Sequence, residues 1–84
     1  MRILFTEAVW EDYLHWQRTD KAMLKRANEL IKDTQRNPFQ GIGKPEPLRW
    51  QLRNCWSRRI DREHRLVYEV EGETLTIIAC RYHY

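Results

Sequence analysis

The second half of the chain holds four runs with strand character, and the gaps between them are too short for most topologies. We place these strands at Leu48–Leu52, Cys55–Ile60, His64–Val70 and Thr74–Tyr82. The gaps are the segments 53–54, 61–63 and 71–73. Connections this short join antiparallel neighbours, whereas a parallel crossover needs about a dozen residues. The spacing therefore predicts an antiparallel meander.

The first half predicts a strand followed by two helices. Arg2–Phe5 is short and apolar, which favours a strand, and Thr6 can cap a helix whose apolar residues follow helical spacing. The pair Thr19-Asp20 interrupts that spacing and offers a second N-cap. A second amphipathic helix begins at Lys21, and Asn37-Pro38 ends it because the residue before proline avoids the helical region. A loop rich in proline and glycine follows over residues 38–47.

The size of the chain limits it to one domain. With 84 residues, of which 42% are apolar, we place that domain over residues 1–84. We predict an α+β fold in two layers: an N-terminal strand, two helices and an antiparallel sheet, with the helices packed on one face. Two cysteines are too few for a disulfide framework, so we expect both to be reduced, in a cytosolic (cytoplasmic) protein. No run approaches the roughly 18 apolar residues of a spanning helix, so we expect no membrane association.

Alternation along the predicted strands assigns side chains to the two faces of the sheet. The side chains expected to face the helices are Trp56, Ile60, Leu66, Tyr68, Val70, Ile78, Cys80 and Tyr82. Those expected on the uncovered face are Ser57, Arg59, Arg65, Val67, Glu69, Leu75, Ile77, Ala79, Arg81 and His83. The same parity puts Arg58 on the apolar side, where we expect it at the rim with its head group reaching solvent.

Positive charge is concentrated in the middle of the sequence. Between Lys44 and Arg65, seven basic residues oppose three acidic ones, a net charge of +4, while the whole chain carries +3. Eleven of the 15 basic residues are arginine, whose planar fork of donors suits phosphate. This distribution favours an anionic polymer such as nucleic acid as the partner. A solvated basic face without a partner explains the same counts.

A carboxylate and a histidine add acid–base chemistry to the arginines. Glu46 lies between Pro45 and Pro47, which restrict the backbone on both sides, and such a carboxylate can take a proton from a ribose 2′-hydroxyl. His83 can exchange protons near neutral pH, and arginines can stabilise the charge of a pentacoordinate phosphate. The alternative interpretation makes Glu46 a solvated charge partner of basic neighbours and His83 part of a frayed terminus.

The remaining histidines and the cysteines suggest no metal centre. His15 and His64 have no obvious partners in the sequence, and we interpret both as structural. The spacing Cys80-x-x-His83 offers half of a zinc site, but only Cys55 is available as a further ligand, and structural zinc takes four. We therefore expect neither a metal nor another cofactor.

Four motifs in order carry a family resemblance. They are Gly43–Leu48 (GKPEPL), Trp56–Ile60 (WSRRI), His64–Tyr68 (HRLVY) and Cys80–Tyr84 (CRYHY). In this combination the whole chain resembles the YoeB family of the RelE/ParE superfamily, the toxins of bacterial type II toxin–antitoxin pairs. The resemblance implies a RelE/ParE-like fold and a ribosome-dependent endoribonuclease. Such an enzyme cuts messenger RNA in the ribosomal A site without a metal, leaving a 2′,3′-cyclic phosphate and a free 5′-hydroxyl.

The resemblance also implies roles for individual residues and partners. Glu46 corresponds to the general base, Arg65 to the group that stabilises the transition state, and His83 to the general acid. The residues expected to bind the RNA are Arg59, Tyr84, Lys44, Arg49 and Arg81. The expected partners are a YefM-like antitoxin with a disordered acidic tail, the 70S ribosome with messenger RNA in its A site, and a second copy of the chain in a homodimer.

The chain departs from the family pattern at one position, and two other functions stay open. Asn54 stands where a glycine is expected, and asparagine is the next most tolerant residue for a left-handed turn. Arg49 and Trp50 fill positions where RNA contacts can differ between relatives. A non-catalytic toxin of the gyrase-poisoning ParE branch would not need a base, an acid and an arginine together. A plain nucleic-acid-binding module would lose affinity steeply with salt and cleave nothing.

Overall fold

The fold consists of two helices and five strands in the order β-α-α-β-β-β-β. The structure, a computed structural model, describes residues 1–49 and 54–82. The elements are β1 (Arg2–Phe5), α1 (Glu7–Thr19), α2 (Lys21–Arg36), β2 (Glu46–Pro47), β3 (Cys55–Arg59), β4 (Arg65–Glu71) and β5 (Thr74–Ala79). The predicted order of one strand, two helices and an antiparallel meander is confirmed.

Both helices begin at the caps that the sequence predicts. The Thr6 hydroxyl accepts a hydrogen bond from the Val9 N–H, and the Asp20 carboxylate accepts one from the Met23 N–H. Each cap satisfies a backbone donor that has no partner within its helix. Asp20 leaves only one non-helical residue between the helices, so the chain turns sharply there. Neither helix is long and apolar enough to cross a membrane, within the residues that the structure describes.

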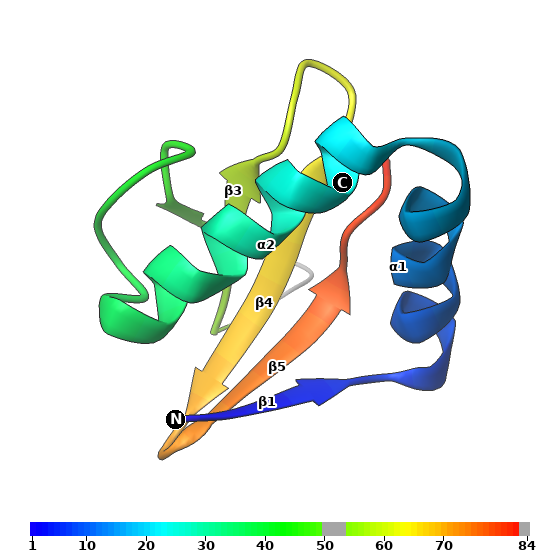
Figure 1. The fold of residues 1–84 in the computed structure, drawn as a ribbon. Coiled ribbons are helices and arrows are strands. Elements are labelled where there is room, and N and C mark those ends of the chain that lie inside the picture. Colours follow the sequence, from blue (N-terminus) through cyan, green and yellow to red (C-terminus); the bar gives the residue numbers. More distant parts are fainter. Residues whose placement is uncertain (50–53, 83–84) are drawn as a thin grey trace.

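The five strands form one sheet in the order β1-β5-β4-β3-β2. The meander from β2 to β5 is antiparallel, and β1 adds to β5 in parallel. The two helices and the strands β2–β4 lie between β1 and β5 in the sequence, so the connection is long enough for a parallel pair. Figure 1 shows α2 lying across the sheet and α1 beside the β1–β5 end, so the helices cover one face. We call the other face of the sheet the open face.

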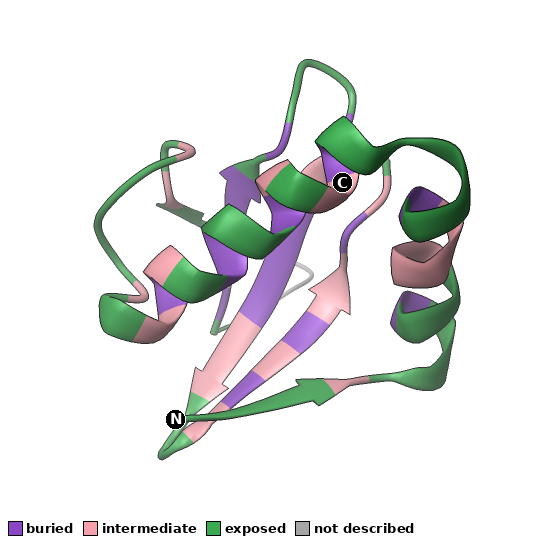
Figure 2. Cartoon of the chain, in the orientation of Figure 1, coloured by how far each residue is buried: buried purple, intermediate pink, exposed green. Residues whose placement is uncertain are grey.

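The hydrophobic core lies between the helices and the covered face. Its residues are Val9, Trp16, Met23, Ala27, Leu30, Ile31, Ile60, Leu66, Tyr68, Leu75, Ile77 and Cys80. Figure 2 shows the buried stripes of both helices and the buried central part of β4. The predicted orientations of Leu66, Tyr68 and Ile60 are confirmed by their burial in this core.

The predicted parity of β5 is wrong over most of the strand. Leu75 and Ile77, expected on the open face, are fully buried in the core, whereas Ile78 is only partly buried. The register explains the difference: Tyr68 pairs with Ile77 but Val67 pairs with Ala79, so Ile78 is an extra residue in a β-bulge. A bulge reverses the alternation of side chains. Beyond it, Cys80 is buried as predicted.

The strand predicted at Leu48–Leu52 is also displaced. The structure places a two-residue strand at Glu46–Pro47, with Glu46 opposite Ser57. Leu48 continues the pairing through one hydrogen bond, from its N–H to the Cys55 carbonyl (2.8 Å), and residues 50–53 of the predicted strand lie outside the described residues. Glu46 is therefore an edge-strand residue rather than part of a loop. The left-handed turn expected at Asn54 is confirmed by a φ of +66°.

Candidate active site

The open face brings the predicted base and two predicted arginines together. Strand pairing aligns Glu46 with Ser57, and Ser57 with Val67. Arg59 lies directly opposite Arg65 in the next row of the same face, because directly paired residues point to the same side of a sheet. A short strand at the edge and two central strands thus place one carboxylate and two guanidinium groups within two neighbouring rows.

Glu46 and Arg65 form an ion pair across this face. Arg65 Nη1 lies 3.6 Å from Glu46 Oε1, and the two side chains line a small cavity of about 60 Å³ with Leu48, Ser57 and Val67. The Glu46 side chain is 61% exposed, so a ligand can reach its carboxylate, while the Arg65 side chain is only 23% exposed. Glu46 is thus a charge partner of Arg65, from a strand two positions away in the sheet, rather than of its sequence neighbours.

Arg65 contacts both Glu46 and the segment that follows β5. Its backbone N–H donates to the carbonyl of Tyr82 (2.8 Å), which ties β4 to the segment that follows β5. Its side-chain Nε is buried and has no hydrogen-bond partner among the residues described. The guanidinium group therefore retains a donor beyond its contact with Glu46. A planar fork of this kind can hold the non-bridging oxygens of a phosphate.

Three of the other predicted RNA-binding residues, Arg59, Lys44 and Arg49, lie near the Glu46–Arg65 ion pair. Arg59 is exposed, and its N–H donates to the Gly43 carbonyl (2.7 Å), which joins β3 to the start of the GKPEPL motif. Lys44 is exposed in a left-handed conformation, with φ of +52°, and Arg49 is exposed just beyond β2. These three therefore lie on or beside the segment that carries Glu46.

Arg81 does not join the arginines of the open face. Its Nη1 lies 3.5 Å from Asp12 Oδ1, and its guanidinium group lies over the rings of Trp16 (5.8 Å) and Tyr82 (4.9 Å). Arg81 therefore attaches the segment after β5 to α1, so its predicted place on the uncovered face is wrong. Tyr82 is 56% exposed rather than directed into the core. The remaining predicted site residues, His83 and Tyr84, lie outside the described residues.

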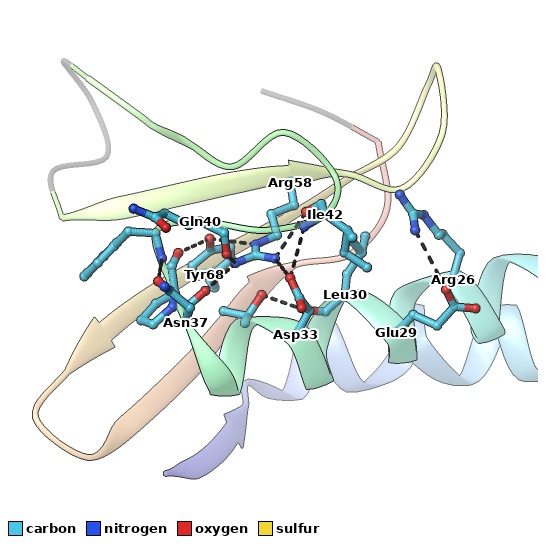
Figure 3. A network of polar contacts seen from close by, with 12 residues as sticks. Arg26, Glu29, Leu30, Asp33, Asn37, Gln40, Ile42, Arg58 and Tyr68 are labelled. Atoms are coloured by element: carbon cyan, nitrogen blue, oxygen red, sulfur yellow. Dashed lines mark hydrogen bonds and ion pairs between the residues drawn. The ribbon is translucent and has the colours of Figure 1, made fainter.

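The segment leading to Glu46 is held by one buried cation, Arg58. Expected at the rim, Arg58 is instead fully buried. Its five N–H groups donate to Tyr68 Oη (3.1 Å), Asp33 Oδ2 (2.6 Å) and the carbonyls of Ile42 (3.1 Å), Asn37 (2.6 Å) and Gln40 (3.0 Å). Figure 3 shows this network between β3, the end of α2 and the loop. Since a guanidinium group has five such donors, every one is satisfied.

Two neighbours complete the network around Arg58. The bond from Arg58 and that from the Ile42 N–H (3.0 Å) lower the pKa of Asp33. The Tyr68 hydroxyl donates in turn to the Pro38 carbonyl (2.6 Å), and burial raises the pKa of this phenol. The loop packs closely as well: a Cβ on Gly43, which has φ of +79°, would lie 2.6 Å from Leu30 Cδ2. The path of the chain from α2 to Glu46 is therefore fixed by buried contacts.

The cysteines are free and inaccessible. Both are buried, and burial, the larger cause, together with Asp12 raises the pKa of Cys80 to about 12. Burial likewise raises the pKa of Cys55. Thiols held in the protonated form are poor nucleophiles and metal ligands. Residues 1–49 and 54–82 contain no group of three side chains placed to hold a metal ion.

Sequence reasoning missed the role of His64 in the geometry of the site. His64 is buried, and its Nδ1 accepts a hydrogen bond from the Tyr82 N–H (2.6 Å). In the HRLVY motif His64 directly precedes Arg65, but this position alone does not indicate what His64 contacts. The partner lies 18 residues away, so no local pattern could identify it.

The arrangement can bind a phosphodiester and exchange a proton beside it. Glu46 is an exposed carboxylate able to accept a proton, and Arg65 and Arg59 are cations able to stabilise negative charge on phosphate. Tyr82, bonded to Arg65, directly precedes His83 in the chain. A carboxylate and guanidinium groups thus meet on the open face, and the described chain up to Tyr82 is tied to Arg65 by one backbone hydrogen bond.

Comparisons with known proteins agree with this geometry. A family model described as the YoeB-like toxin of bacterial type II toxin–antitoxin systems matches residues 5–84. The chain is 60% identical to Toxin YoeB of Escherichia coli K12 over the full length of both chains. It is similar in structure to a YoeB/ParE toxin from Agrobacterium tumefaciens, with a TM-score of 0.97 and 48% identity over all of both chains.

Two structures from Staphylococcus aureus are also similar. A YoeB–YefM complex matches with a TM-score of 0.92 and 46% identity, and a YoeB dimer with 0.93 and 47%. In each case the match covers all of this chain and 98% of the other. The family model and the full-length identity support the same assignment as the four sequence motifs. The chain therefore belongs to the YoeB-like toxins of bacterial type II toxin–antitoxin systems.

Proposed function

We propose that this toxin is a ribosome-dependent endoribonuclease that cleaves messenger RNA in the ribosomal A site by general acid–base catalysis. The observation that carries this proposal is the Glu46–Arg65 pair, whose charged atoms lie 3.6 Å apart on the open face. A carboxylate beside a guanidinium group is the arrangement needed to deprotonate a hydroxyl next to a phosphate. The resemblance of all four sequence motifs to the YoeB family supports the same activity.

In the proposed reaction the RNA supplies its own nucleophile. Glu46 accepts the proton of a ribose 2′-hydroxyl, and the oxygen attacks the adjacent phosphorus. Arg65, assisted by Arg59, stabilises the negative charge of the pentacoordinate phosphate. The bond to the 5′-oxygen breaks, and His83 donates a proton to that leaving group. The products are a 2′,3′-cyclic phosphate and a 5′-hydroxyl.

The other residues of the proposal bind the RNA rather than react. Tyr84 positions the substrate, and the cations Lys44 and Arg49 beside β2 contact its phosphates. Arg81 has a smaller part in binding than its sequence position suggested, because its guanidinium group is 3.5 Å from Asp12 on α1. We further propose a YefM-like antitoxin and a homodimer as partners, since the related S. aureus structures contain a YoeB–YefM complex and a YoeB dimer.

The direct test is cleavage on programmed ribosomes, with the 5′ ends of the fragments mapped. Glu46→Gln removes the base while keeping the shape of the side chain, and we expect cleavage to fall by about 10²–10⁴-fold, the contribution of one acid–base group. Glu71→Gln is the matched control, because Glu71 is an exposed glutamate at the end of β4 and should cut at the wild-type rate.

Three outcomes would refute the proposal. Wild-type cleavage by Glu46→Gln would exclude the carboxylate as the base. Binding of ribosomes without cutting by the wild-type protein would favour a nucleic-acid-binding module. DNA damage and filamentation on expression, with translation intact, would favour a ParE-like toxin.

A further inference from the structure

Two neighbouring residues at the start of β4, His64 and Arg65, form hydrogen bonds with the backbone of Tyr82. Its N–H donates to His64 Nδ1 (2.6 Å), and its carbonyl accepts from the Arg65 N–H (2.8 Å). We propose that His64 is a positioning residue: its unprotonated Nδ1 fixes the backbone of Tyr82, the residue that directly precedes His83 in the sequence. The proposal rests on the proposed function in one respect, the role of His83 as general acid.

Tyr82 needs such a restraint because its conformation is unfavourable. Its φ of +62° lies in the left-handed region, which bulky side chains rarely adopt without support from their surroundings. The Tyr82 side chain is 56% exposed and packs against the His64 ring, with centroids 5.6 Å apart, and against the Arg81 guanidinium group. The two hydrogen bonds act directly on the backbone, and His64 supplies both one of these bonds and a packing contact. The bond to Arg65 uses a backbone N–H that any residue there would supply, so the specific contribution is the His64 ring.

His64 is itself held firmly enough to act as an anchor. Asp61 Oδ1 accepts from the N–H groups of Glu63 (2.8 Å) and His64 (2.7 Å), which fixes the turn before β4. The His64 ring lies edge-on to Trp16, with centroids 4.8 Å apart, and Trp16 Nε1 donates to the Cys80 carbonyl (2.9 Å). The same two aromatic side chains therefore hold the chain at residues 80 and 82.

The restraint depends on the protonation state of His64. Because Nδ1 accepts the Tyr82 N–H, the proton of the neutral ring sits on Nε2, which lies 3.7 Å from Glu63 Oε2. A protonated ring would present an N–H to an N–H, and the bond would be lost. The charged groups in contact with His64 are Asp61, whose carboxylate accepts from its backbone N–H, and Glu63 beside Nε2.

Two substitutions of His64 test separately its hydrogen-bond acceptor and its aromatic ring. His64→Phe keeps a ring against Trp16 but has no acceptor, whereas His64→Asn places an oxygen near the position of Nδ1 and loses the ring. We expect the Tyr82 amide to exchange with solvent about tenfold faster in His64→Phe, the size expected for one hydrogen bond, and to regain protection in His64→Asn. Thermal unfolding of each variant shows whether it is folded before exchange is measured.

Cleavage on programmed ribosomes provides the second readout. We expect His64→Phe to lower kcat by about tenfold or more with little change in KM, and His64→Asn to recover activity.

The possible results decide between the two proposals. Unchanged Tyr82 exchange in folded His64→Phe would show that the ring does not hold the chain. Faster exchange with unchanged kcat would show that holding Tyr82 does not position the acid. If His83→Ala cuts at the wild-type rate while the His64 variants behave as expected in exchange, the assigned role of His83 is wrong and the restraint itself stands.

Discussion

At the scale of single residues, the Asp33 carboxylate stabilises the fold through hydrogen bonds from Arg58 and from the Ile42 N–H. Its pKa lies below the ordinary value of 3.8, chiefly because of the bond from Arg58 and then that from the Ile42 N–H. A carboxyl whose pKa is lower in the folded than in the unfolded protein stabilises the fold above the unfolded value. That contribution disappears as the pH falls through the lowered folded pKa.

We therefore predict that Asp33→Asn lowers the Tm by a constant amount between about pH 5 and pH 8, and that this difference shrinks below about pH 4. The measurement is Tm against pH for both proteins. Glu29→Gln is the control, because its pair with Arg26 is exposed and 3.8 Å long and should contribute little at any pH. A difference that stayed constant down to about pH 2 would show that the charge of Asp33 is not what stabilises the fold.

The sequence identified single residues of the site better than their partners. Prolines on both sides marked Glu46 as a held carboxylate, and alternation placed Arg59 and Arg65 on the open face. Alternation also put Arg58 on the apolar side correctly, but its five acceptors come from the end of α2, the following loop and β4. Contacts between elements that are distant in sequence leave no local pattern. Arg58 was therefore predicted at the rim, although it is buried and all its donors are bonded.

At the scale of elements, the loop that leads to Glu46 depends on the Tyr68 hydroxyl. This group accepts from Arg58 Nε and donates to the Pro38 carbonyl, and Tyr68 is fully buried. Tyr68→Phe leaves Arg58 Nε without this acceptor in the interior and the Pro38 carbonyl without this donor at a partly buried position. We predict a loss of about 1–3 kcal/mol in the free energy of unfolding, measured by urea denaturation.

Tyr13→Phe tests whether burial is the cause. The Tyr13 hydroxyl donates to Asn28 Oδ1 (2.7 Å) at an exposed position, where water can replace the lost partner. This control should change the free energy of unfolding by no more than about 0.5 kcal/mol. Equal losses in the two variants would contradict the prediction.

Element boundaries were predictable wherever a cap or a turn residue marked them. Thr6 and Asp20 fixed the helix starts, and Asn54 fixed the turn before β3. The bulge at Ile78 was not predictable, because an apolar residue at an apolar position leaves no sign that the register shifts. The position of β2 was hidden by its prolines, which argue against a strand except at an edge, and the edge is where it lies.

At the scale of the whole molecule, stability and the proposed chemistry occupy opposite faces of one sheet. The core joins the helices to the covered face, while Glu46, Arg65 and Arg59 lie on the open face. Alternation along β3 and β4 predicted this division, whereas the same reasoning wrongly put Leu75 and Ile77 of β5 on the open face. Substitutions in the core, far from the site, should therefore affect folding without affecting turnover.

Leu75 and Ile77 test that separation. Both are fully buried in β5, and Leu75 pairs with Ile3 of β1, on the far side of β4 from Glu46. We predict that Ile77→Val costs about 0.5–1.5 kcal/mol and Leu75→Ala about 2–5 kcal/mol in the free energy of unfolding. In a domain of this size each kcal/mol lowers the Tm by roughly 4–8 °C.

The same variants should retain wild-type kcat on programmed ribosomes at temperatures where they are fully folded. Glu46→Gln should behave in the opposite way, with cleavage lost and Tm nearly unchanged, because the Glu46 side chain is 61% exposed and its ion pair is long, at 3.6 Å. A fall in kcat that tracks the loss of stability across the core variants would mean that the helical layer and the open face are coupled. The geometry of the site would then depend on the packing of the whole domain. It would not be set only by the start of β4, which carries Arg65, and by the segment that carries Glu46.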